Sequence, residues 1–199
     1  MVKTAAFIEP FDRLNSWLSD AEKSEPNDPT AVSLATVSEN GSPSLRMVLM
    51  KNCDARGLVF YTNLGSKKAQ QLEHNDNAAM LFHWKSLRRQ VRIEGKVIQT
   101  GGEEADKYFA SRARTSRIGA WASKQSQPME SRFEFEAAIA KYTAKFGAGD
   151  IPRPEFWSGF RLVPNYFEFW RDRKFRLHER QTFSLDGDAR SWSLGEIFP

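Results

Sequence analysis

A short polar segment, Glu39-Asn40-Gly41-Ser42, separates two runs of strand-forming residues, AVSLATVS and PSLRMVLMK. Asn-Gly readily supplies the positive φ angles that a tight hairpin turn requires, and both flanking runs have the composition of strands. A pair of neighbouring antiparallel strands is therefore the strongest local prediction for this chain. Any larger architecture must be built around this hairpin.

Further strand-like runs follow the hairpin. LVFYTN, AAMLFHW and RQVRIEGKVIQT predict three more strands, interrupted by a short helix in LGSKKAQQLEHN with Ser66 at its N-cap position. After the connector GDIPRPEFW, strands are predicted in GFRLVPNYFEFW, KFRLHERQTFSL and RSWSL, with Asp186-Gly187-Asp188 as a hairpin turn. This succession favours an antiparallel barrel over a parallel α/β sheet.

Helical periodicity appears in two places. Near the N-terminus, apolar residues recur at helical spacing at Phe11, Leu14, Trp17, Leu18 and Ala21. Between Glu103 and Phe146 the pattern is helical again, and we interpret its clearest stripe as core rather than cofactor contact: Phe135, Ala138, Ile139, Tyr142 and Phe146. We expect one domain over residues 1–199, a mainly β (α+β) fold with helices around a small antiparallel barrel.

Composition excludes several classes of protein. Hydrophobic residues make up 40% of the chain, and the net charge of +4 comes from 29 basic and 25 acidic residues, so the chain is globular and not a polycation. A single cysteine, Cys53, rules out an internal disulfide framework, and the 3 histidines lack metal-ligand spacing. The opening residues lack a signal-peptide core, and no apolar run approaches the roughly 20 residues that span a bilayer. We expect a soluble cytoplasmic protein without a metal site.

The densest basic cluster is WRDRKFRLHER, residues 170–180. If KFRLHERQ is a strand, alternation places Arg176, His178 and Arg180 on one face. Phe175 and Leu177 then point the other way, into apolar surroundings. The basic face suits a phosphate or carboxylate, although an edge strand that uses charge to prevent aggregation has the same pattern.

A second cluster, FYTNLGSKK, places Ser66, Lys67 and Lys68 in the first turn of the expected helix. Backbone N–H groups at a helix start, together with a hydroxyl and two ammonium groups, form an anion site, typically for phosphate. In RMVLMK, the odd separation of Arg46 and Lys51 puts them on opposite faces of a regular strand. Either a bulge intervenes or the two residues serve different groups.

A mixed segment, YFASRARTSRIGAWASKQS, combines hydroxyl, guanidinium and amide groups at Tyr108, Arg112, Ser116, Gln125 and Ser126. The mixture suits a polar ring or a phosphate, and it is equally typical of an ordinary basic surface. The sequence has no Gly-rich nucleotide-binding loop and no nucleophile elbow. Tryptophans beside basic segments are compatible with stacking on nucleic acid, but clusters at separate turns fit small phosphorylated ligands better.

Through RMVLMK, FYTNLGSKK, RRQVRIEGK, YFASRARTSRIGAWASKQS, FWSGFR and EFWRDRKFRLHER, the sequence resembles the pyridoxamine (pyridoxine) 5′-phosphate oxidase family from about Leu14 onward. The resemblance implies an FMN-binding split β-barrel that works as a homodimer, with FMN held noncovalently in clefts between the subunits. It implies FMN contacts at Arg46, Met47, Lys51, Tyr61, Thr62, Lys67, Lys68 and Gln90. Further FMN contacts are implied across the interface at Gln125, Ser126, Trp170 and Arg180.

The resemblance also implies a site for phosphorylated pyridine vitamers, with the substrate phosphate held by Lys51, Tyr108, Arg112 and Ser116. Arg176 and His178 match positions beside the pyridine ring, and we assign the catalytic role to them. Arginine is a poor general base, so Arg176 is expected to orient the reacting carbon. The implied reaction passes a hydride from the carbon bearing the amine or alcohol to the flavin. O2 then reoxidises the flavin and yields hydrogen peroxide, and the amine substrate also releases ammonia.

Two departures from the family pattern bear on these expectations. Glu179 in RLHER stands where the family usually has aspartate, and a regular strand would turn it away from Arg176 and His178. The chain also starts later than members with a basic, tyrosine-containing N-terminal segment, so we expect substrate closure to differ. Two rivals remain: a phenazine-pathway FMN oxidase, whose members usually lack the substrate-phosphate residues, and a non-catalytic flavin- or haem-binding split-barrel protein.

Overall fold

The computed structural model describes residues 4–5, 9–187 and 191–199. Its elements are β1 (Thr4–Ala5), α1 (Glu9–Ser24), β2 (Ala31–Val37), β3 (Pro43–Leu49), β4 (Asn52–Asp54), β5 (Gly57–Asn63), α2 (Lys67–His74), β6 (Asn77–Trp84), β7 (Arg89–Gln99), α3 (Gly102–Ser111), α4 (Arg114–Ala122), α5 (Arg132–Phe146), β8 (Trp157–Arg171), η1 (Lys174–Arg176), β9 (Glu179–Leu185) and β10 (Trp192–Glu196). The strands form one sheet in the order β1-β10-β9-β8-β7-β6-β2-β3, with β5 attached to β8 and β4 to β5. The predicted mainly β, antiparallel α+β architecture is confirmed.

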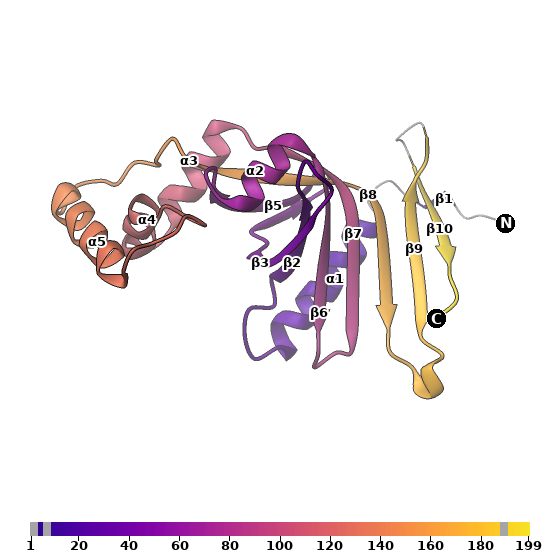
Figure 1. Ribbon diagram of the computed structural model, residues 1–199. Coiled ribbons are helices and arrows are strands. Elements are labelled where there is room, and N and C mark those ends of the chain that lie inside the picture. Colours follow the sequence, from indigo (N-terminus) through magenta and orange to yellow (C-terminus); the bar gives the residue numbers. More distant parts are fainter. Residues whose placement is uncertain (1–3, 6–8, 188–190) are drawn as a thin grey trace.

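Strand β8 is where the barrel splits. One edge of β8 pairs with β7 over almost its whole length, whereas the other edge pairs with β5 in its first half and with β9 in its second half. The sheet therefore curls on one side and opens on the other, as Figure 1 shows, with β9 and β10 at one end of the molecule and α3 to α5 at the other. A register shift between Glu94 and Gly95 bends this region, and a side chain at Gly95 would collide with the Val163 carbonyl.

The predicted β2–β3 hairpin is confirmed, but its turn differs in detail. Gly41 has a φ of +83°, whereas Asn40 has no positive φ. The Gly41 N–H donates to the Ser38 carbonyl and the Ser38 N–H donates to the Ser42 carbonyl. The loop is thus a longer one closed by a left-handed glycine, in place of the two-residue Asn-Gly turn.

The main core lies between α1 and the inner face of the sheet. The predicted helix face is confirmed, since Phe11, Leu14 and Ala21 are buried and Trp17 and Leu18 pack against the same cluster. Phe11 meets Phe167 of β8 edge to face, with ring centroids 5.3 Å apart. α1 therefore closes the open side of the curled sheet.

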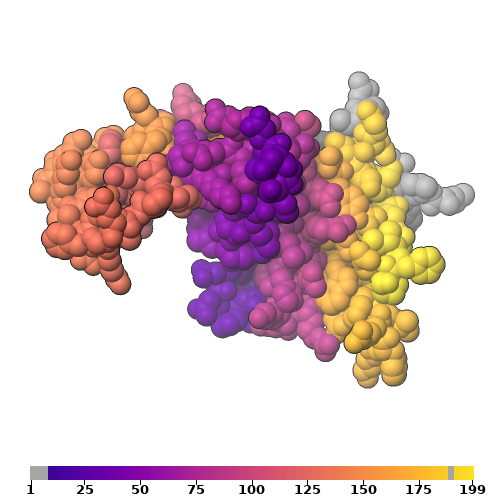
Figure 2. Space-filling view, in the orientation of Figure 1, coloured from indigo at the N-terminus to yellow at the C-terminus, as the bar shows by residue number. Residues whose placement is uncertain are grey.

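Helices α3, α4 and α5 form a separate arm around a small cluster of Phe109, Ile118, Ile151 and Trp157. Figure 2 shows this arm standing away from the body, with a hollow between arm and sheet. Ile139, Tyr142 and Phe146 of the predicted stripe pack against the cluster, whereas Phe135 lines the cavity between arm and sheet, and no residue of α5 is fully buried. α5 is therefore an outer layer, and the expectation of a core stripe was too strong.

The predicted strand KFRLHERQTFSL is wrong in its first half. β8 must reverse its direction to pair with β9, and residues 172–178 form that reversal, in which Phe175 and Arg176 adopt left-handed φ values of +59° and +61°. Strand alternation therefore does not apply to Arg176 and His178. Phe175 and Leu177, expected in apolar surroundings, are 90% and 67% exposed.

At the C-terminal hairpin, β9 and β10 pair as predicted, and the Asp186 N–H donates to the Ser191 carbonyl. Asp188 of the predicted turn lies outside the described residues. Over the same described ranges, no helix combines the length and apolar character needed to cross a membrane.

Candidate active site

A cavity of about 720 Å³ lies between the arm and the sheet. Nine of the predicted site residues line it: Met47, Lys51, Tyr61, Thr62, Lys68, Tyr108, Arg112, Ser116 and Gln125. Among the described lining residues, three are cationic (Lys51, Lys68 and Arg112) and none is acidic. The cavity is therefore suited to a ligand that carries negative charge.

Lys68, in the first turn of α2, is the most deeply placed of these cations. Its ammonium donates to Thr62 Oγ1 at 2.9 Å, to Ser66 Oγ at 3.2 Å and to Gln125 Oε1 at 3.4 Å. Burial, and secondarily the neighbouring Arg46 charge, lower the pKa of Lys68 to about 8. Ser66 occupies the N-cap position, but its side chain makes no cap hydrogen bond. A phosphate would supply the anion that these donors face.

Arg112 follows α3 and lies over an aromatic wall. Its guanidinium carbon is 4.9 Å from the Trp157 ring centroid, and its Nη1 is buried without a hydrogen-bond partner. Burial lowers the pKa of this guanidinium. Tyr61 stacks on Tyr108 with ring centroids 4.0 Å apart and on Trp157 at 5.2 Å. An unpartnered guanidinium N–H in such a place points to an anionic ligand group.

Arg46 and Lys51 were predicted to lie on opposite faces of a strand or to serve different groups, and the end of β3 explains why their surroundings differ. β3 ends at Leu49, so Lys51 lies beyond the strand, where its N–H donates to the Val59 carbonyl and its side chain lines the cavity. Arg46 is directed elsewhere and donates to the Leu34 carbonyl at 3.1 Å and to Gln71 Oε1 at 3.3 Å. The two residues have different surroundings, as the sequence allowed.

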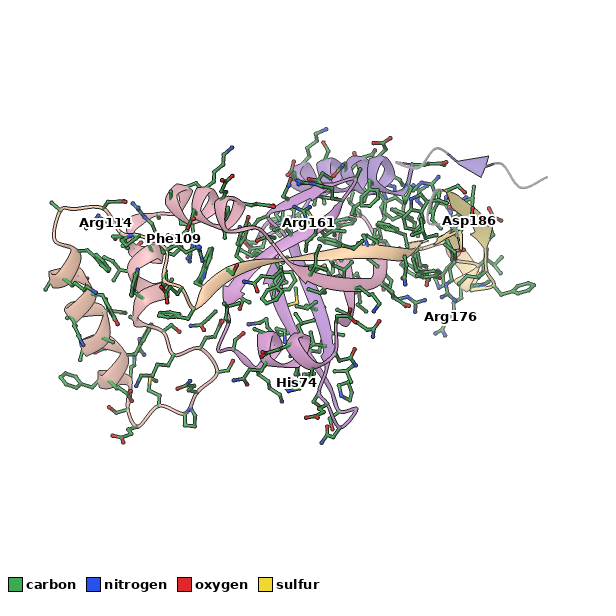
Figure 3. All side chains as sticks on the ribbon, turned by 90° about the horizontal axis from the view of Figure 1, so that it is seen from above. His74, Phe109, Arg114, Arg161, Arg176 and Asp186 are labelled. Carbon is green, nitrogen blue, oxygen red and sulfur yellow. The ribbon has the colours of Figure 1, made fainter. Side chains whose placement is uncertain are left out.

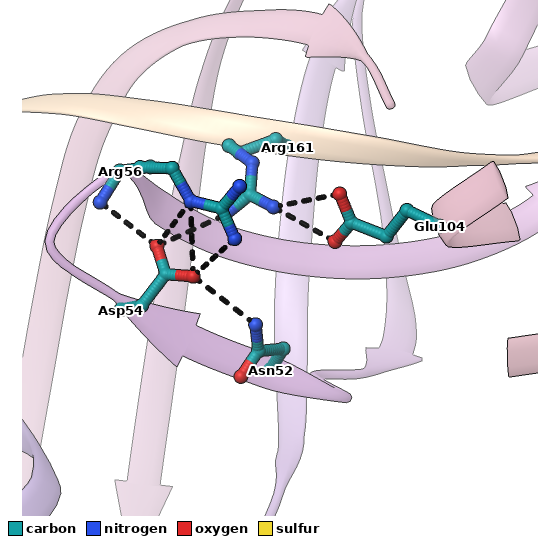
Figure 4. A network of polar contacts seen from close by, with 5 residues as sticks. All are labelled: Asn52, Asp54, Arg56, Glu104 and Arg161. Atoms are coloured by element: carbon teal, nitrogen blue, oxygen red, sulfur yellow. Dashed lines mark hydrogen bonds and ion pairs between the residues drawn. The ribbon is translucent and has the colours of Figure 1, made fainter. Parts of the chain in front are cut away.

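An ion-pair network around the buried Arg161 ties α3 to the sheet (Figure 4). Arg161 of β8 is 5% exposed and donates to both carboxylate oxygens of Glu104, at 2.8 and 3.0 Å. The same guanidinium lies 3.2 Å from Asp54, which also pairs with Arg56. This network joins β4, β8 and α3, and so it holds the helix that carries Tyr108 and leads to Arg112.

A second group of predicted residues lies on the opposite half of the sheet. Gln90 pairs with Trp170 across β7 and β8, and Trp170 pairs with Arg180 across β8 and β9, so the three share one face. They line a groove of about 370 Å³. Sequence reasoning missed Glu168, whose carboxylate accepts from Arg180 Nε at 2.7 Å. That hydrogen bond raises the pKa of Arg180.

The two predicted catalytic residues lie in the β8–β9 connection beside this groove. The His178 ring centroid is 4.7 Å from that of Trp170. Arg176 is exposed, and Figure 3 shows it at the end of the molecule opposite Phe109 and Arg114. A single chain therefore does not bring Arg176 and His178 to the cavity that contains Arg112.

Two further predicted contacts lie outside both regions. Lys67 is exposed and borders a shallow pocket beside the β2–β3 turn. Ser126, with a left-handed φ of +70°, lines a neighbouring cavity of about 770 Å³ beside α4 and α5. Gln125, by contrast, accepts from Thr62 Oγ1 at 2.9 Å within the same chain.

The cavity and the groove are far apart along β8. Trp157 at the start of the strand lines the cavity and Trp170 near its end lines the groove. At about 3.3 Å per residue, roughly 40 Å of strand separates these two side chains. One flavin-sized ligand therefore cannot contact both tryptophans of a single chain.

Comparison with known proteins identifies this arrangement. Residues 18–146 match the family model described as pyridoxamine 5′-phosphate oxidase, and residues 157–199 match the pyridoxine 5′-phosphate oxidase C-terminal dimerisation region. A pyridoxine/pyridoxamine 5′-phosphate oxidase of Brucella canis is 58% identical over 191 residues, which cover 96% of this chain and 94% of the relative. A Brucella melitensis biotype 1 protein of the same name is also 58% identical, over 96% of this chain and 92% of its own.

Two solved structures share the fold. Burkholderia lata PhzG, in complex with tetrahydrophenazine-1-carboxylic acid, superposes with a TM-score of 0.90 at 30% identity, covering 96% of this chain and 92% of PhzG. A pyridoxamine 5′-phosphate oxidase-related, FMN-binding protein of Nostoc punctiforme superposes at 0.75 with 18% identity, covering 96% and 97%. The fold and the cationic cavity thus define a split-barrel protein with a site suited to an anionic ligand. The chain belongs to the pyridoxamine 5′-phosphate oxidase family.

Proposed function

We propose that the chain is an FMN-dependent oxidase that converts pyridoxamine 5′-phosphate or pyridoxine 5′-phosphate to pyridoxal 5′-phosphate. O2 is the electron acceptor and hydrogen peroxide the co-product, and the amine substrate also yields ammonia. The observation that carries the proposal is the cavity with Lys51, Lys68 and Arg112 among its lining residues and no carboxylate among them. Residues 1–199 act as one domain, in the cytoplasm, where the single Cys53 stays reduced.

The residues present fit a flavin phosphate. Lys68 is a buried cation whose pKa is lowered by burial, and the Thr62 and Ser66 hydroxyls converge on its ammonium. We assign the FMN contacts to Arg46, Met47, Lys51, Tyr61, Thr62, Lys67, Lys68, Gln90, Gln125, Ser126, Trp170 and Arg180. When bound, FMN supplies a two-electron acceptor that no side chain provides.

The substrate phosphate is assigned to Lys51, Tyr108, Arg112 and Ser116, which all line the same cavity. The unpartnered Nη1 of Arg112 supports this assignment, because a phosphate oxygen would satisfy it. Burial raises the pKa of Tyr108, so its hydroxyl stays protonated and can donate. Anchoring the phosphate lets Arg176 orient the reacting carbon, and we place His178 beside the substrate ring.

A homodimer would complete the site. Residues 157–199, which match the dimerisation region, contain Trp170, Arg176, His178 and Arg180. On one chain these residues are remote from the cavity, and a second copy could bring them to it. β3 presents Leu45, Met47 and Leu49 with 70%, 60% and 40% exposure, an apolar strip at the cavity edge suited to a subunit contact.

A phenazine-type oxidase is the second candidate, because PhzG superposes closely. The substrate-phosphate residues Lys51, Tyr108, Arg112 and Ser116 all line the cavity and favour a phosphorylated substrate instead. The greater identity to the Brucella oxidases, 58% against 30% for PhzG, points the same way.

The deciding experiment is a steady-state assay of FMN-loaded protein. Oxygen consumption and aldehyde formation are measured with pyridoxamine, pyridoxine and their 5′-phosphates. We expect turnover of the phosphorylated forms and little with the others. Absence of turnover on both phosphates would refute the proposal, and turnover of only a tricyclic carboxylic acid would favour the phenazine-type reaction.

A further inference from the structure

His178 lies at the end of the β8–β9 connection, and its ring contacts groups from that connection and from β8. Nδ1 is 3.1 Å from Asp172 Oδ1 and 3.3 Å from the backbone nitrogen of Arg173. The ring also packs against Trp170. The His178 side chain is 23% exposed and that of Asp172 is 16% exposed, so both groups are largely removed from solvent.

The two neighbours of Nδ1 favour opposite tautomers. A protonated Nδ1 donates to the Asp172 carboxylate and leaves Nε2 as an acceptor. An unprotonated Nδ1 accepts from the Arg173 N–H, and the ring proton then resides on Nε2. Nδ1 lies closer to Asp172 Oδ1, at 3.1 Å, than to the Arg173 nitrogen, at 3.3 Å, and the negative charge of the carboxylate favours a proton on Nδ1. We therefore expect Asp172 to decide which tautomer predominates.

Asp172 is itself held from a second element. Its other carboxylate oxygen pairs with the guanidinium of Arg88, in the turn between β6 and β7. Its backbone N–H donates to the Arg88 carbonyl at 3.1 Å, and Arg88 has a left-handed φ of +52°. The β6–β7 turn, through Arg88, therefore holds the Asp172 carboxylate in its position facing His178.

The connection is constrained on its other side as well. Arg173 forms an ion pair with Glu179 at 2.7 Å. Phe175 and Arg176 both have left-handed φ values, a backbone conformation that non-glycine residues keep only where the surrounding structure imposes it. The Asp172–His178 contact therefore lies in a loop of defined shape. Glu179, the first residue of β9, pairs with Arg173 of that loop and offers a matched control.

We propose that Asp172 is a positioning residue for His178, selecting the Nδ1-protonated tautomer so that Nε2 accepts a hydrogen bond from a hydroxyl or protonated amine of the substrate. The proposal rests on the proposed function, in which His178 contacts the substrate. Arg88 takes part indirectly by orienting the Asp172 carboxylate.

The first test reads the tautomer directly. With ¹⁵N-labelled protein at a pH where the ring is neutral, two-bond ¹⁵N–¹H correlations of the 3 histidines distinguish Nδ1–H from Nε2–H, and His178→Gln identifies the relevant signals. We expect Nδ1–H in the wild type and in Glu179→Gln, and a shift toward Nε2–H in Asp172→Ala. Asp172→Asn keeps an oxygen acceptor and should retain mostly Nδ1–H.

Kinetics on FMN-loaded protein provide the second readout. We expect Asp172→Ala to lower kcat about tenfold with little change in KM for the phosphorylated substrate, Asp172→Asn to recover most of the loss, and Glu179→Gln to behave as wild type. An unchanged tautomer in Asp172→Ala, or an equal kcat loss in Glu179→Gln, overturns the proposal. If the wild type oxidises neither phosphate, the proposed function fails, and the tautomer comparison still decides the role of Asp172.

Discussion

Replacing Lys68 with methionine should stabilise the protein without FMN while weakening its hold on FMN. Lys68 is 8% exposed, and no carboxylate is among the described residues that line its cavity. Its pKa falls from 10.5 to about 8, through burial first and the Arg46 charge second. At about 1.4 kcal/mol per pH unit, holding this ammonium charged at pH 7 costs the folded protein about 3 kcal/mol.

Methionine keeps a similar length and apolar stem but loses the hydrogen bonds to Thr62 and Ser66, which offset part of the gain. We expect a net stabilisation of about 1–2 kcal/mol, a rise in Tm of about 2–8 °C for a chain of this size. The assay is thermal unfolding of FMN-free protein at pH 7, with Lys67→Met, an exposed neighbour, as the matched control. The FMN Kd of Lys68→Met, from fluorescence titration, should rise about ten- to hundredfold.

The pH dependence carries a definite sign. The folded-state pKa of Lys68 lies below its unfolded value, so the unfolded chain binds more protons between about pH 8 and 10.5. The contribution of Lys68 to the free energy of unfolding therefore rises with pH across that window, and its destabilising effect is fully present below pH 8. Lys68→Met removes this slope. A lower Tm than Lys67→Met, or an unchanged FMN Kd, would refute the reasoning.

Three other predictions follow from the same geometry. In the wild type, the FMN Kd should rise by up to tenfold per pH unit above about pH 8, as Lys68 loses its proton in the free protein; a flat profile in fluorescence titration would contradict this. Arg176→Ala and His178→Ala should lower turnover while FMN stays bound, and loss of the flavin absorption would show that these residues serve the other ligand. Arg112→Ala should raise KM for the phosphorylated substrate about ten- to hundredfold and hardly affect unphosphorylated pyridoxamine, whereas equal effects on both would remove Arg112 from the phosphate site.

The fold was predictable where the local pattern and the tertiary context agree. In β2, which precedes the Asn40-Gly41 turn, the residues alternate between buried and half-buried positions, as the strand pattern predicts. In α1, the apolar face that includes Leu14 is the face that is buried. The β8–β9 connection was not predictable, because Asp172 is the single turn-forming residue in 172–178, and Phe175 and Arg176, which adopt the left-handed backbone, are not residue types that favour it. Their left-handed backbone arises from the reversal between paired strands, which a local pattern does not encode.

The residues of the candidate site also fall into those that a local motif predicts and those that only the tertiary fold brings together. The clusters around Lys68 and Arg112 were visible as short motifs, and the family resemblance supplied their expected ligands. The contact of Gln125 with Thr62 joins positions 63 residues apart in the chain, and it depends on how the arm folds back on the sheet. Glu168 was missed because an acidic residue within a strand gives no sign of the arginine it will face across a neighbouring strand.

An anaerobic half-reaction tests the central claim most directly. FMN-loaded protein is mixed with pyridoxamine 5′-phosphate without oxygen, the flavin absorption is followed, and oxygen is then admitted. Electron transfer from the phosphorylated substrate to the flavin predicts bleaching of the yellow absorption with formation of the aldehyde, and return of the colour with hydrogen peroxide on aeration. An absorption that stays unchanged with both pyridoxamine 5′-phosphate and pyridoxine 5′-phosphate would contradict the proposed function.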